Sequence, residues 1–173
     1  MKIDVDSIRL RHLARSDAPA IRAGLEDGVL ARNMMNIPFP FHVGAEYEFI
    51  ERVSKNGARG IVGYVDGIET LLGTCGIHLP FDDAKEADFE VGYMVFQKYW
   101  SNGVGTRAIE LLISTVDVDA TIAAGVMHDN PASLRVFEKL GFVATSESVC
   151  PSKGRGGEEV PTTVFILNQY ERE

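Results

Sequence analysis

The feature that most constrains this chain is the octet Tyr99-Trp100-Ser101-Asn102-Gly103-Val104-Gly105-Thr106, because of the segments on either side of it. Residues 89–96 have the composition of a strand, and residues 107–116 are apolar at helical spacing. A strand that turns through two glycines into a helix leaves several backbone N–H groups without partners at the positive end of the helix dipole. The octet therefore predicts an anion site that suits a phosphate group.

Taken alone, the octet is a weak signal, since turns of many kinds use glycine. It matches neither of the common phosphate loops. No Lys-Ser/Thr pair follows the glycines, and Arg107 or Ala108 stands where the dinucleotide fingerprint has its third glycine. An ordinary turn therefore remains the alternative interpretation, and a phosphate group would have to be held in another way.

A second strand and a second helix follow the first pair. Residues 120–128 are again typical of a strand, and Asn130 then precedes a proline, as at the start of a helix. Gly141 provides a C-terminal stop for that helix. Its apolar positions are Leu134, Phe137 and Leu140. The order of these elements is more specific than any single residue in them.

With these elements the chain resembles the GNAT superfamily of acyl-CoA-dependent N-acetyltransferases. Asn130-x-x-Ser133, the Leu140-Gly141-Phe142 ending and the Tyr99-Trp100 pair are similar to the branch that includes the ribosomal-protein N-terminal acetyltransferases. The resemblance covers nearly the whole chain and implies one acyl-CoA N-acyltransferase domain over residues 1–173. It implies an α/β (α+β) fold of three layers, with a mixed, mostly antiparallel twisted sheet that is splayed at its centre and has helices on both faces.

The resemblance implies acetyl-CoA as co-substrate, with its pyrophosphate held by main-chain amides and no metal. The N–H group of Val95 is expected to meet the thioester carbonyl, and the two central strands are expected to part at Phe96–Gln97 to admit the pantetheine arm. The residues that the resemblance assigns to coenzyme A are Val95, Ser101, Asn102, Gly103, Val104, Gly105, Thr106, Asn130 and Ser133.

Two positions depart from the family pattern. Trp100 stands where the wider superfamily commonly has Arg or Gln, so a side-chain contribution to the anion site is in doubt. Phe137 stands where many members have a tyrosine that acts as general acid, and it has no proton to give. Ser133 is the nearest substitute as donor to the leaving thiolate, and water is the alternative.

The chemistry of acetyl transfer sets the remaining residue types, since the attacking amine must be neutral and a base must take its proton. Glu90 is the predicted base, because it lies on the strand before the glycine loop among apolar neighbours that would raise its pKa. An outward-facing strand carboxylate is the alternative. His128 is a second base candidate, ranked below Glu90. Asn130 and Ser133 could also form only a helix N-cap.

Composition excludes several classes of protein. Acidic side chains outnumber basic ones 25 to 17 without a basic stripe, which disfavours nucleic-acid binding. Cys75 and Cys150 are too few for a disulfide framework or a zinc site, and Cys75 is expected in the core, with a nucleophilic role as the alternative. No apolar run suggests a signal peptide or a membrane helix, so we expect a cytoplasmic protein, with a homodimer possible.

The rest of the chain predicts strands at 7–13, 60–65, 70–79 and 162–167, a hairpin turn at Asp66-Gly67, and helices near 18–25 and 43–53. The second of these helices has Tyr47, Ile50 and Val53 at helical spacing. Residues 33–42 form an unusually apolar connector, and residues 146–161 are expected to be a mobile loop beside the acceptor.

The sequence thus predicts transfer of an acetyl group from acetyl-CoA to a primary amine. The α-amine of a protein or peptide is favoured over a polyamine, amino-acid or aminoglycoside-like amine. Two alternatives remain: a non-catalytic module that binds or senses acyl-CoA, which Phe137 makes plausible, and a nucleotide-phosphate binder that uses the glycine loop.

Overall fold

The computed structural model describes residues 1–168. Its centre is a seven-stranded sheet of order β1-β2-β3-β4-β5-β7-β6. The strands are β1 (Ile3–Arg11), β2 (Arg59–Val65), β3 (Ile68–His78), β4 (Phe89–Val95), β5 (Thr121–Met127), β6 (Val143–Ser152) and β7 (Glu158–Asn168). The α-helices are α1 (Ala18–Leu25), α2 (Ala45–Lys55), α3 (Val104–Ile113) and α4 (Pro131–Lys139). Short 3₁₀ turns are η1 (Arg15–Asp17), η2 (Ala31–Asn33), η3 (Asp82–Ala84), η4 (Gln97–Tyr99) and η5 (Lys153–Arg155).

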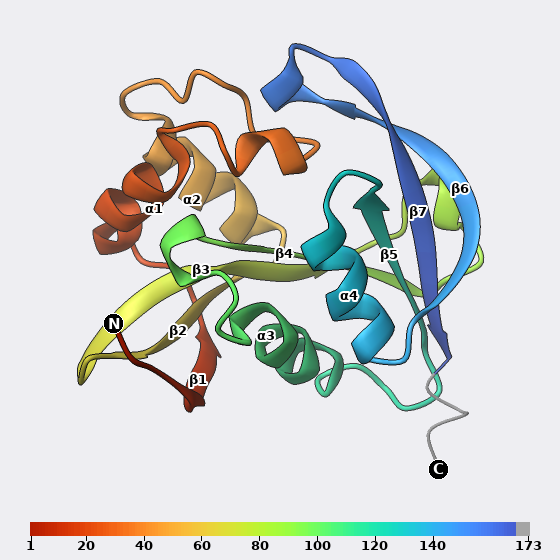
Figure 1. Cartoon of the computed structure of the whole chain (residues 1–173), viewed down its shortest axis with the longest axis horizontal. Helices are drawn as coiled ribbons and strands as arrows, with labels where there is room; N and C mark the ends of the chain where they lie inside the picture. Colours follow the sequence, from red (N-terminus) through yellow and green to blue (C-terminus); the bar gives the residue numbers. More distant parts are fainter. Residues whose placement is uncertain (169–173) are drawn as a thin grey trace.

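The sheet is antiparallel except at one place, the pairing of β4 with β5. Helices α1 and α2 cover one face, and α3 and α4 cover the other (Figure 1). This is the predicted three-layer fold. The β2–β3 hairpin turns at Asp66 and Gly67, both with positive φ, as the sequence indicates.

The central strands part earlier than predicted. β4 pairs with β5 only at Phe89–Ile122 and Glu90–Ala123, whereas the sequence places the separation at Phe96–Gln97. That placement was wrong because both strands keep their apolar character beyond the last pair. Val91 and Val126 remain buried against other elements after the ladder has ended. The opening between the strands therefore extends along most of β4.

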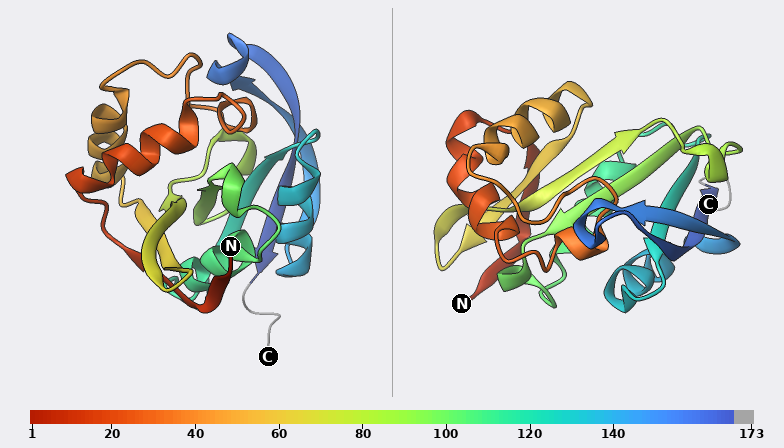
Figure 2. Two further views of the ribbon diagram at one scale, coloured as in Figure 1. Left: turned by 60° about the vertical axis from the view of Figure 1, so that its left-hand side comes forward. Right: turned by 90° about the horizontal axis from the view of Figure 1, so that it is seen from above.

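Residues 146–161 are not the predicted mobile loop. They belong to the β6–β7 hairpin, which is paired as far as Ser152–Glu158, and only a short turn separates the strands. Gly156 and Gly157 have positive φ in that turn, so the glycines mark only the hairpin tip. β6 is an edge strand with mostly exposed residues, so its sequence lacks the apolar alternation of a half-buried strand. Figure 2 shows the hairpin extending beyond the rest of the sheet.

Helix α2 faces the core with a different side than the sequence suggests. Ile50 is buried as the sequence predicts, but Phe49 and Glu46 are buried too, whereas Tyr47 is exposed. Glu46 can be buried because Arg22 of α1 donates to its carboxylate at 2.7 Å. An ion pair between α1 and α2 thus replaces an apolar contact on this face.

Candidate active site

A cavity of about 1320 Å³ lies between the separated strands and reaches both sides of the sheet. On the α3/α4 side it is lined by the glycine loop and by Asn130 and Ser133 at the start of α4. On the α1/α2 side it is lined by apolar residues of the 33–37 segment and of α2. Glu90 lies on the strand between the two compartments. The cavity therefore connects most of the residues that the sequence singles out.

The glycine loop presents its amides without protein partners. Within the described residues, no hydrogen bond uses the N–H groups of residues 101–106, and the first amide of α3 that donates to the loop is Arg107, to the carbonyl of Gly103 at 3.0 Å. Ser101 and Gly103 have positive φ, at 61° and 76°, which turns the chain into the helix. These amides stand at the helix N-terminus, where the dipole favours an anion.

Trp100 fixes this loop to the strand before it. Its indole Nε1 donates to the carbonyl of Val95 at 2.6 Å, and Asn102 Nδ2 donates to the carbonyl of Trp100 at 2.7 Å. Trp100, which departs from the family pattern, thus stabilises the loop and contributes no polar side chain to the anion site. Asn102 is absent from the cavity lining, so its side chain also acts on loop shape.

The amide of Val95 faces the opening between the strands. The next amide, that of Phe96, donates to the carbonyl of Leu72 on β3 at 2.9 Å. Successive amides of a strand point to opposite edges, so the N–H of Val95 points away from β3 and towards β5. A carbonyl placed in the opening could accept this hydrogen bond.

Glu90 is a buried carboxylate, 7% exposed, and not the outward-facing strand residue of the alternative interpretation. Phe81 donates its N–H to Oε2 at 3.0 Å. Burial raises the pKa of the Glu90 carboxyl above its ordinary value, although the amides of Phe81 and Gly125 and the nearby His78 oppose the rise. A carboxyl group with a raised pKa is suited to accept a proton near neutral pH.

His78 is a cavity residue that the sequence did not single out. It pairs with Glu90 in the β3–β4 register, and its Nδ1 donates to the carbonyl of Leu79 at 2.8 Å when that nitrogen carries the proton. Nε2 is then the nitrogen left to accept a hydrogen bond. His78 could be found from the sequence only through its pairing with Glu90 in the β3–β4 ladder. That register depends on the length of the β3–β4 connection, which the sequence does not define.

Asn130 and Ser133 form the helix N-cap given as the alternative, and they line the cavity as well. Asn130 Oδ1 accepts from the Ser133 N–H at 3.3 Å, and Asn130 Nδ2 donates to Ser133 Oγ at 3.1 Å. The cap therefore orients the hydroxyl of Ser133. Capping and a place in the cavity are compatible roles here.

Tyr93 is the second cavity residue that the sequence missed. Its hydroxyl shares a hydrogen bond of 3.0 Å with Ser133 Oγ. Burial raises the pKa of this phenol, so it keeps its proton over a wide pH range. Phe137 packs against the Tyr93 ring at 6.0 Å between centroids, so a protonated hydroxyl lies on β4 beside the α4 position that lacks one. In the sequence Tyr93 looked like one more apolar neighbour of Glu90.

The remaining candidates, His128 and the two cysteines, either lie outside the cavity or stay protonated at neutral pH. His128 is not among the cavity residues, and its ring contacts Glu147 on β6. Cys75 and Cys150 are both buried and free. Burial raises the pKa of Cys75 to about 12 and also raises that of Cys150, so neither is a thiolate at neutral pH. Cys75 is the core residue that the sequence predicts.

Among residues 1–168, no cluster of three or more His, Cys, Asp or Glu side chains is placed to hold a metal ion. In the same part of the chain, no helix is long and apolar enough to cross a membrane.

A sheet opened between two parallel strands, with unpaired helix N-terminal amides on one side and a buried carboxylate on β4, defines the class of acyl-CoA-dependent N-acyltransferase folds. The chain belongs to the acetyltransferase (GNAT) domain family, whose match covers residues 7–143. It is therefore a GNAT acetyltransferase of a family that binds acetyl-CoA.

Individual relatives agree with this assignment. The chain is 28% identical over 148 residues to the uncharacterized N-acetyltransferase YoaA of Bacillus subtilis (strain 168), with 81% of each chain covered. A GNAT-family acetyltransferase from Bacillus anthracis superposes with a TM-score of 0.72 at 21% identity, covering 99% of this chain and 100% of that one. Mycobacterium smegmatis RimJ in complex with CoA-disulfide gives 0.75 at 17% identity, with 98% and 86% covered. Similarity at these identities concerns the fold and does not single out the ribosomal-protein branch.

Proposed function

We propose that the chain is a single-domain enzyme that transfers an acetyl group from acetyl-CoA to a primary amine by direct attack on the thioester. The α-amine of a protein or peptide is the favoured acceptor. The observation that carries the proposal is the unpaired amide row at 101–106, which opens into the same cavity as a buried carboxylate. Acetyl-CoA carries the two chemistries this cavity fits, a pyrophosphate and a thioester.

The amides of residues 101–106 bind the pyrophosphate in this proposal, as a helix N-terminus does for other phosphates. The N–H of Val95, directed into the opening, donates to a carbonyl of the acyl-pantetheine arm. The N-cap formed by Asn130 and Ser133 borders that arm on the α4 side.

Glu90 takes the proton of the incoming ammonium group, directly or through one water, which leaves a neutral amine to attack. The C–N bond of the product amide forms as the C–S bond of the thioester breaks. Ser133 donates a proton to the leaving thiolate, and the Tyr93 hydroxyl, 3.0 Å from Ser133 Oγ, restores it. The attacking amine loses its second N–H proton to water as it becomes the amide, and water returns a proton to Tyr93. Tyr93 and Ser133 thus supply the acid that Phe137 cannot.

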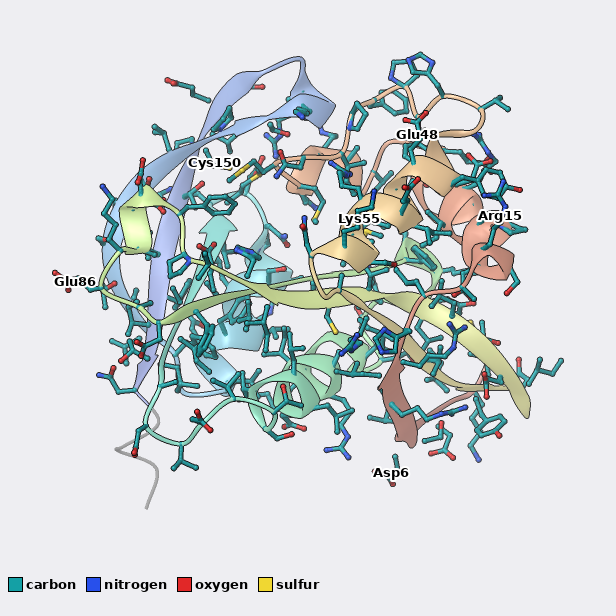
Figure 3. All side chains as sticks on the ribbon, turned by 180° about the vertical axis from the view of Figure 1, so that it is seen from behind. Asp6, Arg15, Glu48, Lys55, Glu86 and Cys150 are labelled. Atoms are coloured by element: carbon teal, nitrogen blue, oxygen red, sulfur yellow. The ribbon has the colours of Figure 1, made fainter. Side chains whose placement is uncertain are left out.

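Thiol release from acetyl-CoA over a panel of amines tests this proposal against a binding module without turnover. The wild type is expected to release thiol with at least one amine, and Glu90→Gln to lose about 10²-fold or more of that rate while still binding coenzyme A. Glu86→Gln is the matched control, because Glu86 is exposed at the outer edge of the molecule (Figure 3). Binding of coenzyme A without turnover on any amine would favour the sensor.

A nucleotide-phosphate binder predicts a different ligand profile. Thermal stabilisation by ATP or NAD, with none by coenzyme A, would assign the glycine loop to a nucleotide instead.

A further inference from the structure

The tip of the β6–β7 hairpin lies beside the segment around η2 (Figures 1 and 2), where Met34 and Met35 line the cavity. The amide of Lys153 donates to the carbonyl of Met35 at 3.0 Å, and Ser152 Oγ donates to that of Met34 at 3.1 Å. A Cβ added at Gly154 would lie 2.2 Å from the carbonyl oxygen of Ala31, so the two backbones are in close contact. We call residues 31–35 and 152–155 the acceptor roof.

A buried arginine fixes the acceptor roof to the start of α4. The Arg155 side chain is only 8% exposed, and its guanidinium donates to both carboxylate oxygens of Asp129, at 2.7 and 2.9 Å. Its Nε also donates to the carbonyl of Arg32 at 2.8 Å. Asp129 lines the cavity, but this pairing satisfies its charge within the protein. Its negative charge is therefore already compensated by Arg155 before a cationic substrate enters.

Few negative charges are left for an acceptor. Among the described residues that line the cavity, the carboxylates are Asp83, Glu90 and Asp129, and the last is paired with Arg155. Asp83 is exposed and Glu90 is buried. A polyamine or an aminoglycoside carries several ammonium groups, and desolvating each of them requires a partner charge. The cavity can pair one such group deep inside and one at its edge.

The walls around Glu90 are apolar and rich in sulfur. Met35 of the roof packs against Met127, Cys150 and Val160, which form a small buried cluster. Figure 3 shows Cys150 on the hairpin where it faces the η2 segment. Ile37 and Phe81 extend the apolar lining. Thioether side chains are flexible and polarizable, so this wall can adapt to apolar groups of different shape.

We propose that the acceptor is a primary amine with a single positive charge and a medium-sized apolar side chain next to it. The α-amine of a methionine-, leucine- or phenylalanine-like residue has this chemistry, whether it comes from a peptide N-terminus or from a free amino acid. The apolar side chain lies against Met35 and Cys150, and the amine meets Glu90. This inference rests on the proposed acetyl transfer and names its substrate class.

The test compares kcat/KM for tripeptide amides that differ only in the first residue: Met, Leu, Phe, Ser and Asp. Free methionine and leucine form a second arm, and spermidine and an aminoglycoside form a third. We expect Met-, Leu- or Phe-first peptides, or the free apolar amino acids, to exceed Ser- and Asp-first peptides by about tenfold or more. The first two arms distinguish a peptide source from a small-molecule source of the same chemistry.

Two variants of Met35 in the cavity wall distinguish a change in acceptor preference from a loss of the folded structure. Met35→Gln is expected to reduce the apolar preference several-fold with an unchanged KM for acetyl-CoA, and Met35→Leu is expected to keep the preference. A preference for Ser, Asp, spermidine or the aminoglycoside would overturn the inference while leaving acetyl transfer intact. Turnover with none of the amines, despite binding of coenzyme A, would overturn both the inference and the proposed enzyme.

Discussion

At the scale of single residues, burial decides what Glu90 can do. Its carboxyl group is 7% exposed and its pKa lies above the ordinary value. The loss of hydration disfavours the charged form more than the amides of Phe81 and Gly125 and the nearby His78 favour it. A group whose folded-state pKa is raised stabilises the fold at low pH and loses that contribution as the pH rises through the folded pKa. At neutral pH, a charged Glu90 therefore lowers the free energy of unfolding, whereas an uncharged residue at this position would not.

Glu90→Gln separates a catalytic role of this carboxylate from its effect on stability. The amide oxygen of glutamine can still accept from Phe81, so we expect a thermal midpoint at pH 7.5 equal to or above that of the wild type. We also expect the acid limb of the wild-type kcat/KM profile to lie above the value of about 4.3 of an ordinary glutamate, and to vanish in the variant. A variant that keeps both activity and acid limb would remove Glu90 from the mechanism.

Tyr93→Phe tests the proton donor at the same scale. The change removes the hydroxyl that contacts Ser133 and keeps the ring beside Phe137. We expect kcat to fall about 10- to 10²-fold with little change in the KM for acetyl-CoA, since general acids contribute on this order. Tyr64→Phe, a change at a half-exposed ring on β2, serves as the control. An unchanged kcat in Tyr93→Phe would leave water as the donor.

At the scale of elements, the sequence carries most information where an element has a buried stripe. α3 buries Val104, Ala108, Ile109 and Leu112, a helical period visible in the chain, and the Asp66-Gly67 turn predicts the β2–β3 hairpin directly. β6 has no such stripe, because it is the exposed edge strand beside β7, and the sequence predicts its residues 146–152 as part of a loop. His78 and Tyr93 were missed for a related reason, since their roles depend on strand register and on contact with α4.

Gly105→Ala tests how closely α3 must approach β4. A Cβ at this position would lie 2.7 Å from the Tyr93 ring, so either the ring or the helix N-terminus must move. We expect a loss of affinity for coenzyme A of about tenfold or more by isothermal titration calorimetry, since a carbon contact this short forces packing to shift. Ser114→Ala, at the other end of the helix, is expected to bind normally. Normal binding by Gly105→Ala would show that the loop tolerates a shifted helix.

At the scale of the whole molecule, one arginine joins parts of the chain that are distant in sequence. Arg155 contacts Asp129 before α4 and Arg32 in η2, so it connects the acceptor roof to the start of α4. The guanidinium of Arg155 lowers the pKa of Asp129. A group with a lowered folded-state pKa contributes stability above its unfolded pKa and loses it as the pH falls through the folded value.

Arg155→Ala is therefore expected to lower the thermal midpoint at neutral pH by a few degrees, and less at acid pH once Asp129 is protonated. It is also expected to raise the KM for the acceptor more than that for acetyl-CoA, because the roof loses its anchor. Lys153→Ala, at an exposed position in the same turn, should change neither quantity. Equal effects on both KM values would mean that Arg155 holds the fold without shaping the acceptor compartment.

The central claim is that the amides of residues 101–106 hold a pyrophosphate. It is tested most directly by following backbone amide signals in ¹⁵N–¹H NMR while coenzyme A, and separately pantetheine, is added. We expect coenzyme A to shift the signals of Ser101 to Thr106 strongly, and pantetheine, which lacks the pyrophosphate, to leave them nearly unchanged. If coenzyme A binds while the signals of those amides keep their free-state positions, the phosphate groups lie elsewhere and the glycine loop is not the pyrophosphate site.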